Sequence, residues 1–338
     1  MTGTPITLSH HLLIDQVLDQ ERDPKAGDLW ALLVQLSLVA KVISREVKRA
    51  ALVGKLGFTG EVNVQGEQMR ELDLWSNEIC VNALKESRLV CTVVSEEMEH
   101  PVHFDRNCRA ESFIVCIDPV DGSSNIDVNG TVGTIFSVRR RIGQGREHAL
   151  ADPLRKGNEQ VAAGYLMYGP STILVYTAGR GVYGFTLDET IGEYILSHPD
   201  MTIPRRGKTY SVNQGNYHRW PERTRRAVDY LNSPDKSTGR PYSLRYVGSM
   251  VSDLHRTLLD GGIFMYPAEE GKKSSGKLRL LYEAQPMGYV VEQAGGRAST
   301  GTERILDIQP SAYHQRVPLI IGSADDVALI EEFYRGQR

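Results

Sequence analysis

The sequence is poor in cysteine, with four in 338 residues and no C-x-x-C pair. Cys91 and Cys116 fall in apolar runs that we expect to be buried strands, Cys80 in a helical pattern, and Cys108 in a polar stretch. Scattered cysteines of this kind are typical of a reducing compartment, where they pack as small hydrophobic side chains. We therefore expect a cytoplasmic protein whose cysteines act as packing residues.

The sequence also lacks a long apolar run. Its most apolar stretch, residues 30–43, is interrupted by Gln35 and Lys41, and residues 1–28 contain no basic segment followed by an apolar one. These absences predict neither export nor a membrane span. The formal net charge of −3 gives no reason to expect a nucleic-acid partner.

Several catalytic and cofactor motifs are missing as well: there is no G-x-S-x-G elbow and no Walker loop. Residues 179–184 match G-x-G-x-x-G, but strand patterns flank them on both sides, so we expect a hairpin turn. His100 and His103 lie in a polar stretch where no nearby ligand set completes a zinc site, so we expect them at the surface.

What is present is a short apolar run, residues 113–117, that ends in D-P-V-D-G-S-S at residues 118–124. Pro119 favours extended backbone at Asp118, and Gly122 permits a tight turn, so the carboxylates of Asp118 and Asp121 can converge on one point. The amides that follow are then free to face an anion. On its own, such a segment is more often a plain turn than a metal site.

A second strand-like run, residues 89–95, ends in Glu96 and Glu97. Two neighbouring strands that both end in paired carboxylates would crowd four negative charges. That arrangement is costly unless hard cations neutralise the charges. The second acidic strand end therefore favours a metal site over a turn.

Apolar periodicity predicts the other elements. The expected helices cover residues 28–52 with Asp28 as the cap, 68–87, 222–231, 251–259, 280–294 with a kink or restart at Pro286, and 325–334. The expected strands cover residues 131–138, 161–168, 172–177 and 182–187, paired as an antiparallel meander, and then 244–247, 263–266 and 317–321. Residues 54–66 are predicted to be a glycine-rich loop, either inert or a mobile flap, and residues 198–208 a domain boundary.

Taken together, several segments resemble class I fructose-1,6-bisphosphatase. Residues 96–97 and 118–124 resemble the signature of the magnesium-dependent, lithium-sensitive sugar and inositol phosphatases as a whole. The segments that narrow the resemblance are residues 123–127, 133–136, 162–165, 246–250 and 276–283. The similarity runs from about residue 28 to the C-terminus.

The resemblance implies an α+β fold, the layered αβαβα sugar-phosphatase fold, with mixed sheets in two domains. The N-terminal domain would be residues 1–200, and the C-terminal, sugar bisphosphate-binding domain residues 201–338. The implied assembly is a homotetramer without nucleic-acid or membrane partners. The implied reaction is the hydrolysis of fructose 1,6-bisphosphate to fructose 6-phosphate and phosphate, a gluconeogenic step.

The resemblance also implies roles for individual residues. The ligands of Mg²⁺, with Mn²⁺ as a substitute, would be Glu96, Glu97, Asp118, Asp121, Glu283 and the carbonyl of Val120. The catalytic residues would be Asp73, Glu97 and Asp121, with Asp73 and Glu97 polarising the attacking water. Carboxylate ligands suit Mg²⁺ better than zinc, and a metal-activated water needs no covalent phospho-enzyme.

The implied substrate contacts are Asp121, Gly122, Ser123, Ser124, Asn213, Arg245, Tyr246, Gly248, Ser249, Met250, Tyr266 and Lys277. Those at residues 122–124 would hold the phosphate that is removed, and those in the C-terminal half the 6-phosphate and the sugar, with Arg245 supplied across a subunit interface. Without the resemblance, Tyr246 and Tyr266 would be predicted to be core aromatics and Lys277 a surface lysine. Asn216 stands where animal members carry a phosphate-binding tyrosine, so Asn216 or Tyr217 would substitute.

The AMP site of the family is only partly matched. K-A-G-D-L-W at residues 25–30 replaces a threonine-rich turn, and Ser112-Phe113 replaces a Lys-Tyr pair, while Arg140 matches the family. A buried phosphate without charge-assisted donors loses roughly 1.5–3 kcal/mol per lost bond. We therefore expect AMP to inhibit weakly or not at all.

Three alternatives stay open at this point. A broader sugar bisphosphatase would also use sedoheptulose 1,7-bisphosphate, which the implied pocket residues do not exclude. A metal-binding regulatory protein without catalysis is disfavoured because Asp73, Glu97 and Asp121 are all present. An inositol monophosphatase is disfavoured because a monophosphate would leave the implied 6-phosphate donors with nothing to bind.

Overall fold

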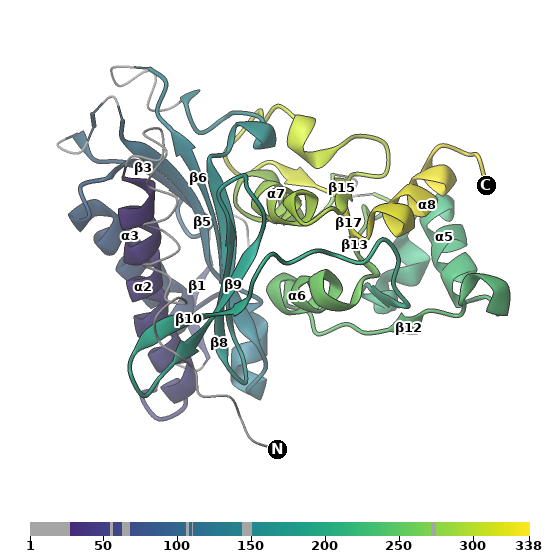
Figure 1. The fold of residues 1–338 in the computed structure, drawn as a ribbon, viewed down its shortest axis with the longest axis horizontal. Coiled ribbons are helices and arrows are strands. Elements are labelled where there is room, and N and C mark those ends of the chain that lie inside the picture. The colour runs from purple at the N-terminus through teal and green to yellow at the C-terminus, as the bar shows by residue number, and fades with distance from the viewer. Residues whose placement is uncertain are drawn as a thin grey trace.

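The computed structural model describes residues 28–54, 57–62, 68–105, 108–109, 111–143, 151–271 and 275–338. Five layers alternate through it in the order helices, sheet, helices, sheet, helices (Figure 1). Both large sheets mix parallel and antiparallel pairs. The expected α+β class and αβαβα layering are therefore confirmed, with one large sheet in each of two domains.

The first helical layer consists of α2 (Leu29–Arg49) and α3 (Glu71–Glu86). In α2 the apolar residues recur at helical spacing and are buried on one face, which packs toward α3 and the first sheet. Asp28 makes no side-chain capping bond, so the capping prediction is wrong, although its carbonyl accepts from the Leu32 amide at 3.1 Å.

The helix predicted over residues 68–87 begins only at Glu71, because β2 (Gln68–Arg70) pairs with β1 (Phe58–Val62). The loop prediction for residues 54–66 is therefore wrong at β1. Residues 55–56 and 63–66 lie outside the described part of the chain. The short strands went unrecognised because glycine and polar residues interrupt any alternation of apolar side chains.

The eight-stranded first sheet has the strand order β10-β9-β8-β7-β6-β5-β3-β4. Its strands are β3 (Val90–Ser95), β4 (Val102–His103), β5 (Phe113–Asp121), β6 (Val132–Arg140), β7 (Ala162–Tyr168), β8 (Thr172–Thr177), β9 (Tyr183–Asp188) and β10 (Glu193–His198). From β5 to β10 each strand pairs antiparallel with the next, so the predicted meander and the hairpin turn at residues 179–184 are confirmed. β10 was not predicted, because most of its residues stay partly exposed at the sheet edge.

β3 and β5 are adjacent and parallel. Their carboxyl ends therefore lie at the same edge of the sheet, as the two acidic strand ends predicted. In both strands every residue is buried, which explains why they appear in the sequence as continuous apolar runs.

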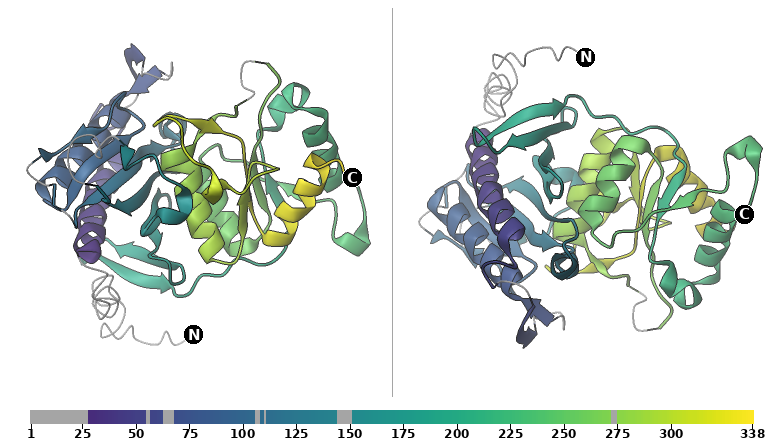
Figure 2. Two further views of the ribbon diagram at one scale, coloured as in Figure 1. Left: turned by 90° about the horizontal axis from the view of Figure 1, so that it is seen from above. Right: turned by 90° about the horizontal axis from the view of Figure 1, so that it is seen from below.

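The middle layer holds α6 (Met250–Asp260), the π-helix η7 (Leu280–Ala284) and α7 (Gln285–Gln293) (Figure 2). Pro286 lies in the first turn of α7, where proline costs no helical hydrogen bond. The predicted restart at Pro286 is therefore confirmed. The turn before it is a π-helix, which the apolar spacing could not distinguish from an α-helix.

The second sheet has the order β12-β11-β13-β17-β15, and α5 (Glu222–Asn232) and α8 (Ala324–Tyr334) form the outer layer. Its strands are β11 (Thr209–Ser211), β12 (Ser243–Leu244), β13 (Ile263–Tyr266), β15 (Arg297–Ser299) and β17 (Leu319–Gly322). A separate pair joins β14 (Leu278–Arg279) to β16 (Arg316–Val317). The strand expected over residues 244–247 ends at Leu244, and the three-residue strands β11 and β15 were too short to predict.

Three large apolar clusters fill the spaces between the five layers. The middle cluster combines side chains of the first sheet, such as Tyr165, with side chains of the second, such as Phe264, around α6 and α7. The two domains therefore share a continuous core. No helix of the described chain is long and apolar enough to cross a membrane.

Two of the four cysteines depart from the prediction, which is confirmed for Cys80 and Cys116. Cys91 and Cys108 form a disulfide with a Cα–Cα distance of 4.7 Å, whereas Cys80 and Cys116 are free and buried. The bond could not be expected from the cysteine spacing, because the pairing of β4 with β3 brings residue 108 back to residue 91. His103 was expected at the surface, but it lies partly buried against this pair.

Candidate active site

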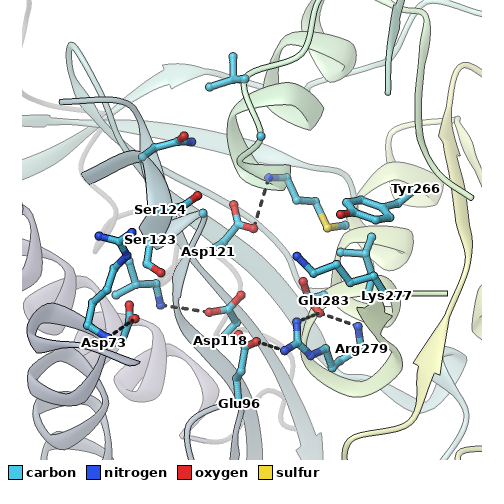
Figure 3. Close-up of a pocket in the computed structure, with 18 of the residues that line it drawn as sticks. Asp73, Glu96, Asp118, Asp121, Ser123, Ser124, Tyr266, Lys277, Arg279 and Glu283 are labelled. Carbon is cyan, nitrogen blue, oxygen red and sulfur yellow. Dashed lines mark hydrogen bonds and ion pairs between the residues drawn. The ribbon is translucent and has the colours of Figure 1, made fainter. Parts of the chain in front are cut away.

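A pocket of about 760 Å³ lies where β3 and β5 end, and it is lined from both domains (Figure 3). The carboxylates predicted from the sequence converge on it from four elements. Asp73 comes from the first turn of α3, Glu96 and Glu97 from the turn after β3, Asp118 and Asp121 from β5, and Glu283 from η7. The predicted acidic cluster therefore exists as a spatial cluster.

Asp118, Asp121 and Glu283 form its centre. All three are buried, and each offers an oxygen within 4.8 Å of the others. Asp118 accepts a hydrogen bond from the Val120 amide at 3.1 Å, where the pairing of β5 with β6 shifts register between Asp118 and Asp121. Because Glu283 belongs to the C-terminal half, the centre forms only when the two domains are packed together.

Hydrogen bonds from the start of α6 fix the side chain of Asp121, which belongs to β5. Its carboxylate accepts from the Ser249 hydroxyl at 2.7 Å, the Val251 amide at 2.9 Å and the Met250 amide at 3.3 Å. Amides at a helix N-terminus stabilise a negative charge, and these bonds oppose the effect of burial on Asp121. Ser249 thus orients a carboxylate and does not itself line the pocket.

Burial raises the pKa values of these carboxyl groups. It raises the pKa of Asp73 and of Asp121 to about 6 and that of Glu283 to about 8. For Asp118 burial acts together with the charges of Glu96, Asp121 and Glu283, and its pKa lies well above the usual range. The protein alone therefore disfavours the fully charged cluster.

Arg279 partly balances the cluster. Its guanidinium lies 2.8 Å from Glu96 Oε1 and 3.8 Å from Glu283 Oε2, and its backbone amide donates to Glu283 at 2.5 Å (Figure 3). One cation facing this many carboxylates leaves negative charge in excess. Among the described residues that line the pocket none is a histidine or a cysteine, so the donor set suits a hard divalent cation.

Beside the cluster, Gly122 turns the chain from β5 into the short 3-10 helix Ser123–Val128. Gly122 has a φ of +74°, and a Cβ there would come within 2.6 Å of Ser249 Cβ. Only glycine fits this turn without strain. The turn presents Ser123 and Ser124 to the pocket.

The opposite wall comes from the C-terminal half. Six of the residues that the resemblance assigns to substrate binding line it: Asn213, Tyr246, Gly248, Met250, Tyr266 and Lys277. Lys277 is therefore not simply a surface lysine: its Nζ lies 5.9 Å from the centre of the Tyr266 ring. Arg245 does not line the pocket but is exposed, with Nη1 donating to the Leu244 carbonyl at 3.2 Å.

Sequence reasoning missed several lining residues: Phe58, Arg70, Asn125, Val247, Phe264, Leu278 and Arg279. Arg279 stands within a segment that carried the resemblance, and a cation beside four acids could have been expected. Arg70 gave no such signal; its guanidinium pairs with Asp127 and lies 4.4 Å from the Phe58 ring.

Asp253, fully buried, accepts from the amides of Val247 at 2.9 Å and Gly248 at 3.2 Å and so fixes the adjacent wall.

Comparisons with known proteins agree with this geometry. The family model "Fructose-1-6-bisphosphatase, N-terminal domain" matches residues 6–199, and "Fructose-1-6-bisphosphatase, C-terminal domain" matches residues 203–335. The class 1 fructose-1,6-bisphosphatase of Oleidesulfovibrio alaskensis is 50% identical over 336 residues, and that of Maridesulfovibrio salexigens is 51% identical over 334. In both cases the alignment covers 98% of each chain.

Solved structures show the same relationship. The crystal structure of Leishmania major fructose-1,6-bisphosphatase in holo form matches with a TM-score of 0.90 and 41% identity, covering 96% of this chain and 98% of the other. The apo form matches with a TM-score of 0.85 and 39% identity, covering 96% and 99%. The chain belongs to the class 1 fructose-1,6-bisphosphatase family.

Proposed function

We propose that this chain is a phosphoric monoester hydrolase that removes the 1-phosphate of fructose 1,6-bisphosphate, giving fructose 6-phosphate and phosphate. The observation that carries the proposal is one pocket in which a buried carboxylate cluster lies opposite a wall with Lys277, Tyr246, Tyr266 and Asn213. A substrate with a phosphate at each end matches both sides. Family membership supports the same reaction.

In this proposal Glu96, Glu97, Asp118, Asp121, Glu283 and the Val120 carbonyl hold Mg²⁺, for which Mn²⁺ can substitute. Carboxylate oxygens are the ligands that Mg²⁺ prefers, and bound cations relieve the repulsion within the cluster. The bound metal supplies an activated water and stabilises charge on the phosphoryl group. The chain's own residues then have three tasks: to orient the water, to hold the departing phosphate and to anchor the sugar.

Asp73 and Glu97 are the proposed partners of the attacking water. Burial brings the pKa of Asp73 to about 6, so near neutral pH it is largely ionised yet basic enough to accept a proton from the water. The hydroxyls of Ser123 and Ser124 and the amides at the Gly122 turn would donate to the phosphate. Phosphoryl transfer depends mainly on such positioning and charge stabilisation.

The experiment that tests the proposal is phosphate release with Mg²⁺ from fructose 1,6-bisphosphate, sedoheptulose 1,7-bisphosphate and inositol monophosphate. We expect preference for the fructose ester and loss of activity when the metal is chelated. Comparable rates with the sedoheptulose ester would favour the broader sugar bisphosphatase. No release from any of the three would contradict the proposal and favour a non-catalytic metal protein.

We also propose that AMP inhibits weakly or not at all. Residues 25–27 of the altered turn lie outside the described part of the chain. At the other end of the implied site, the Arg140 guanidinium lies 5.1 Å from the centre of the Phe113 ring. Phe113 offers a nucleotide phosphate no donor in its side chain. An AMP titration in the same assay tests this, and an inhibition constant in the low micromolar range would contradict it.

A homotetramer acting in gluconeogenesis in the cytoplasm completes the proposal. The exposed Arg245 supports the tetramer, because a guanidinium outside its own pocket is free to reach a neighbouring subunit's pocket. Light scattering of the purified chain measures the assembly. A monomer with full activity would contradict the shared arginine.

A further inference from the structure

His314 does not line the pocket, but it joins two of the segments that supply the pocket's carboxylates. Its Nε2 lies 3.2 Å from the carbonyl oxygen of Glu99, at the end of the turn that follows β3. Its Nδ1 lies 2.8 Å from the hydroxyl of Tyr282, which directly precedes Glu283 in η7. One imidazole therefore connects the turn after β3 with the π-helix.

The partners of the ring determine which nitrogen carries the hydrogen. A carbonyl oxygen can only accept, so Nε2 of His314 donates to Glu99. A neutral imidazole then has a lone pair at Nδ1, which accepts from the Tyr282 hydroxyl. The hydrogen bonds thus run in one direction, from η7 through the ring to the turn after β3.

Tyr282 needs such a partner because it is fully buried. Its side chain packs with Val94 of β3 and Cys116 of β5 in an apolar cluster. A tyrosine hydroxyl in such surroundings is costly unless it forms a hydrogen bond. The ring of His314 also packs edge-on against the Tyr282 ring, with 5.9 Å between the ring centres. The contact therefore fixes both the hydroxyl and the ring of Tyr282.

The π-helical turn makes the place of Tyr282 important. The Gln285 amide donates to the Leu280 carbonyl and closes the wide turn of η7. Turns of this kind are rare and are found mostly at functional sites. Here the turn brings Glu283 to the centre of the carboxylate cluster. A contact that fixes Tyr282 also fixes the direction of the next side chain, Glu283.

The loop that carries His314 is firmly held. The Leu280 amide donates to the Gln315 carbonyl at 2.8 Å, and β16 pairs with β14 directly afterwards. Within the loop, Gln315 Oε1 accepts from the amide of Ser311 at 2.7 Å and from its hydroxyl at 2.9 Å. The imidazole is therefore presented by a rigid support.

The turn after β3 is anchored at both ends. At its start the Glu96 amide donates to the Ile117 carbonyl of β5 at 3.1 Å, and at its end the Glu99 carbonyl accepts from His314. Inside the pocket, Arg279 joins the same two segments through charge, since it pairs with Glu96. The contacts of His314 go to a backbone carbonyl and a hydroxyl, so they affect the spacing of the segments and leave the charge of the cluster unchanged.

We propose that His314 is a positioning residue that fixes the spacing between the turn after β3 and η7 and thereby strengthens the binding of the divalent cation. The part about the cation rests on the proposed function, in which both segments carry ligands. A cluster that is already spaced for the cation loses less conformational freedom when the cation binds. Breaking the hydrogen bonds of His314 loosens this spacing and lowers the affinity.

The first test measures Mg²⁺ binding to the full chain by titration calorimetry, without substrate. His314→Phe keeps a ring in place and removes both nitrogens. We expect its Kd for Mg²⁺ to rise about tenfold, the low end of the losses seen when groups supporting a metal ligand are altered. His100→Phe is the matched control: His100 is exposed and adjacent to Glu99, and its variant should keep the natural Kd. An unchanged Kd in His314→Phe would overturn the proposal.

Two further variants separate the two hydrogen bonds of His314. Asparagine places its amide where Nδ1 lies and keeps the contact with Tyr282, whereas glutamine reaches the place of Nε2 and keeps the contact with Glu99. We expect an intermediate Kd for each. Adding Tyr282→Phe should lower the affinity further in His314→Asn but hardly in His314→Gln, because the latter has already lost that contact. Equal further losses would contradict the chain of hydrogen bonds. If His314→Phe does not fold, these variants decide the question.

Kinetics distinguish positioning from general stability. In His314→Phe the Mg²⁺ concentration for half-maximal rate should rise by the same factor as the Kd. The KM for fructose 1,6-bisphosphate at saturating Mg²⁺ should stay unchanged, because the wall with Lys277 and Tyr266 is not altered. A variant that is less stable to urea but keeps the natural Kd would show a merely structural role and overturn the proposal.

The outcomes also separate this proposal from the proposed function. A natural protein that binds Mg²⁺ but releases no phosphate from fructose 1,6-bisphosphate contradicts the reaction, and the comparison of Kd values still decides the role of His314. A natural protein that binds no Mg²⁺ overturns both.

Discussion

Three donors around the start of α6 fix the Asp121 carboxylate at the centre of the acidic cluster. We predict that Asp121→Asn lowers kcat at least about a hundredfold, since the amide loses the charge and matches the three donors poorly. Steady-state phosphate release measures this, and circular dichroism should show the same fold. Asp260→Asn, at the other end of the same helix, is the control and should keep full activity.

Glu283 gives the metal-free protein a pH-dependent stability. Burial raises its pKa from 4.5 to about 8, so the folded state keeps a proton that the unfolded state releases. We predict that stability falls as the pH rises from about 4.5 to about 8, because the folded state binds more protons across that window. Asp73 and Asp121 add to the fall between their ordinary range and about pH 6.

Thermal unfolding with a chelator present measures this slope. Glu283→Gln should flatten it above pH 6, whereas Glu193→Gln, on an exposed edge strand, should not. Saturating Mg²⁺ should stabilise the protein more at pH 8 than at pH 6, because binding requires ionised carboxylates. A slope that is equally steep with the glutamine in place would contradict the assignment to Glu283.

Substitution of Lys277 tests the proposed contact with the second phosphate of the substrate. A charge-assisted hydrogen bond contributes roughly 1.5–3 kcal/mol, so Lys277→Met should lower kcat/KM about tenfold to a hundredfold. Lys236→Met, on an exposed turn away from the pocket, should leave kcat/KM unchanged. The effect of the first variant should shrink for a sugar monophosphate, and an equal loss on both substrates would argue against a contact with the second phosphate.

At the scale of elements, the turn from β5 into the 3-10 helix depends on Gly122. We predict that Gly122→Ala destabilises the protein by about 1–3 kcal/mol and lowers activity, because the new Cβ meets Ser249 and the backbone conformation is strained. Gly192→Ala is the matched control: its φ of +71° is similar, but a Cβ there contacts nothing within 4 Å. Urea unfolding of the two variants separates the clash from the strain, and equal losses would contradict the clash.

The same scale shows what the sequence could predict about the fold. The long helices and the buried strands β3, β5, β7 and β8 carry enough apolar residues in series for their type to be recognised. Strands of two or three residues, such as β11 and β15, have no measurable period. Their existence depends on neighbours that are distant in the chain. The helix expected over residues 68–87 begins later than predicted for the same reason. Residues 68–70 pair with β1, and this distant partner determines where the helix starts.

The residues of the candidate site also differ in how far local sequence could predict them. The carboxylates at the ends of β3 and β5 could be predicted because the sequence places them directly after recognisable strands. Lys277 and Tyr266 could be predicted only by resemblance, because nothing in their local sequence distinguishes them from surface and core residues. The Cys91–Cys108 bond could not be predicted, since it depends on how β4 folds back on β3.

At the scale of the whole molecule, the shared middle core should make the two domains unfold together. We predict a single calorimetric transition that Mg²⁺ and inorganic phosphate shift upward as one, by about 2.7 kcal/mol of stability at a hundred times their dissociation constant. The reason is that the pocket draws its lining from both domains. Two separate transitions, with only one responding to the ligands, would contradict this coupling.

Glu283 lies in the C-terminal half of the chain, whereas Asp118 and Asp121 lie in the N-terminal half. This division limits how the sequence can recombine during evolution. A crossover near residue 200 that joins halves from two relatives would have to keep the packing around α6 and α7 and the spacing of the three carboxylates at the same time. Halves that each fold well in their parents can therefore give an inactive hybrid. We therefore expect the two halves to evolve as a unit. Compensating substitutions should occur mainly at the interface between them.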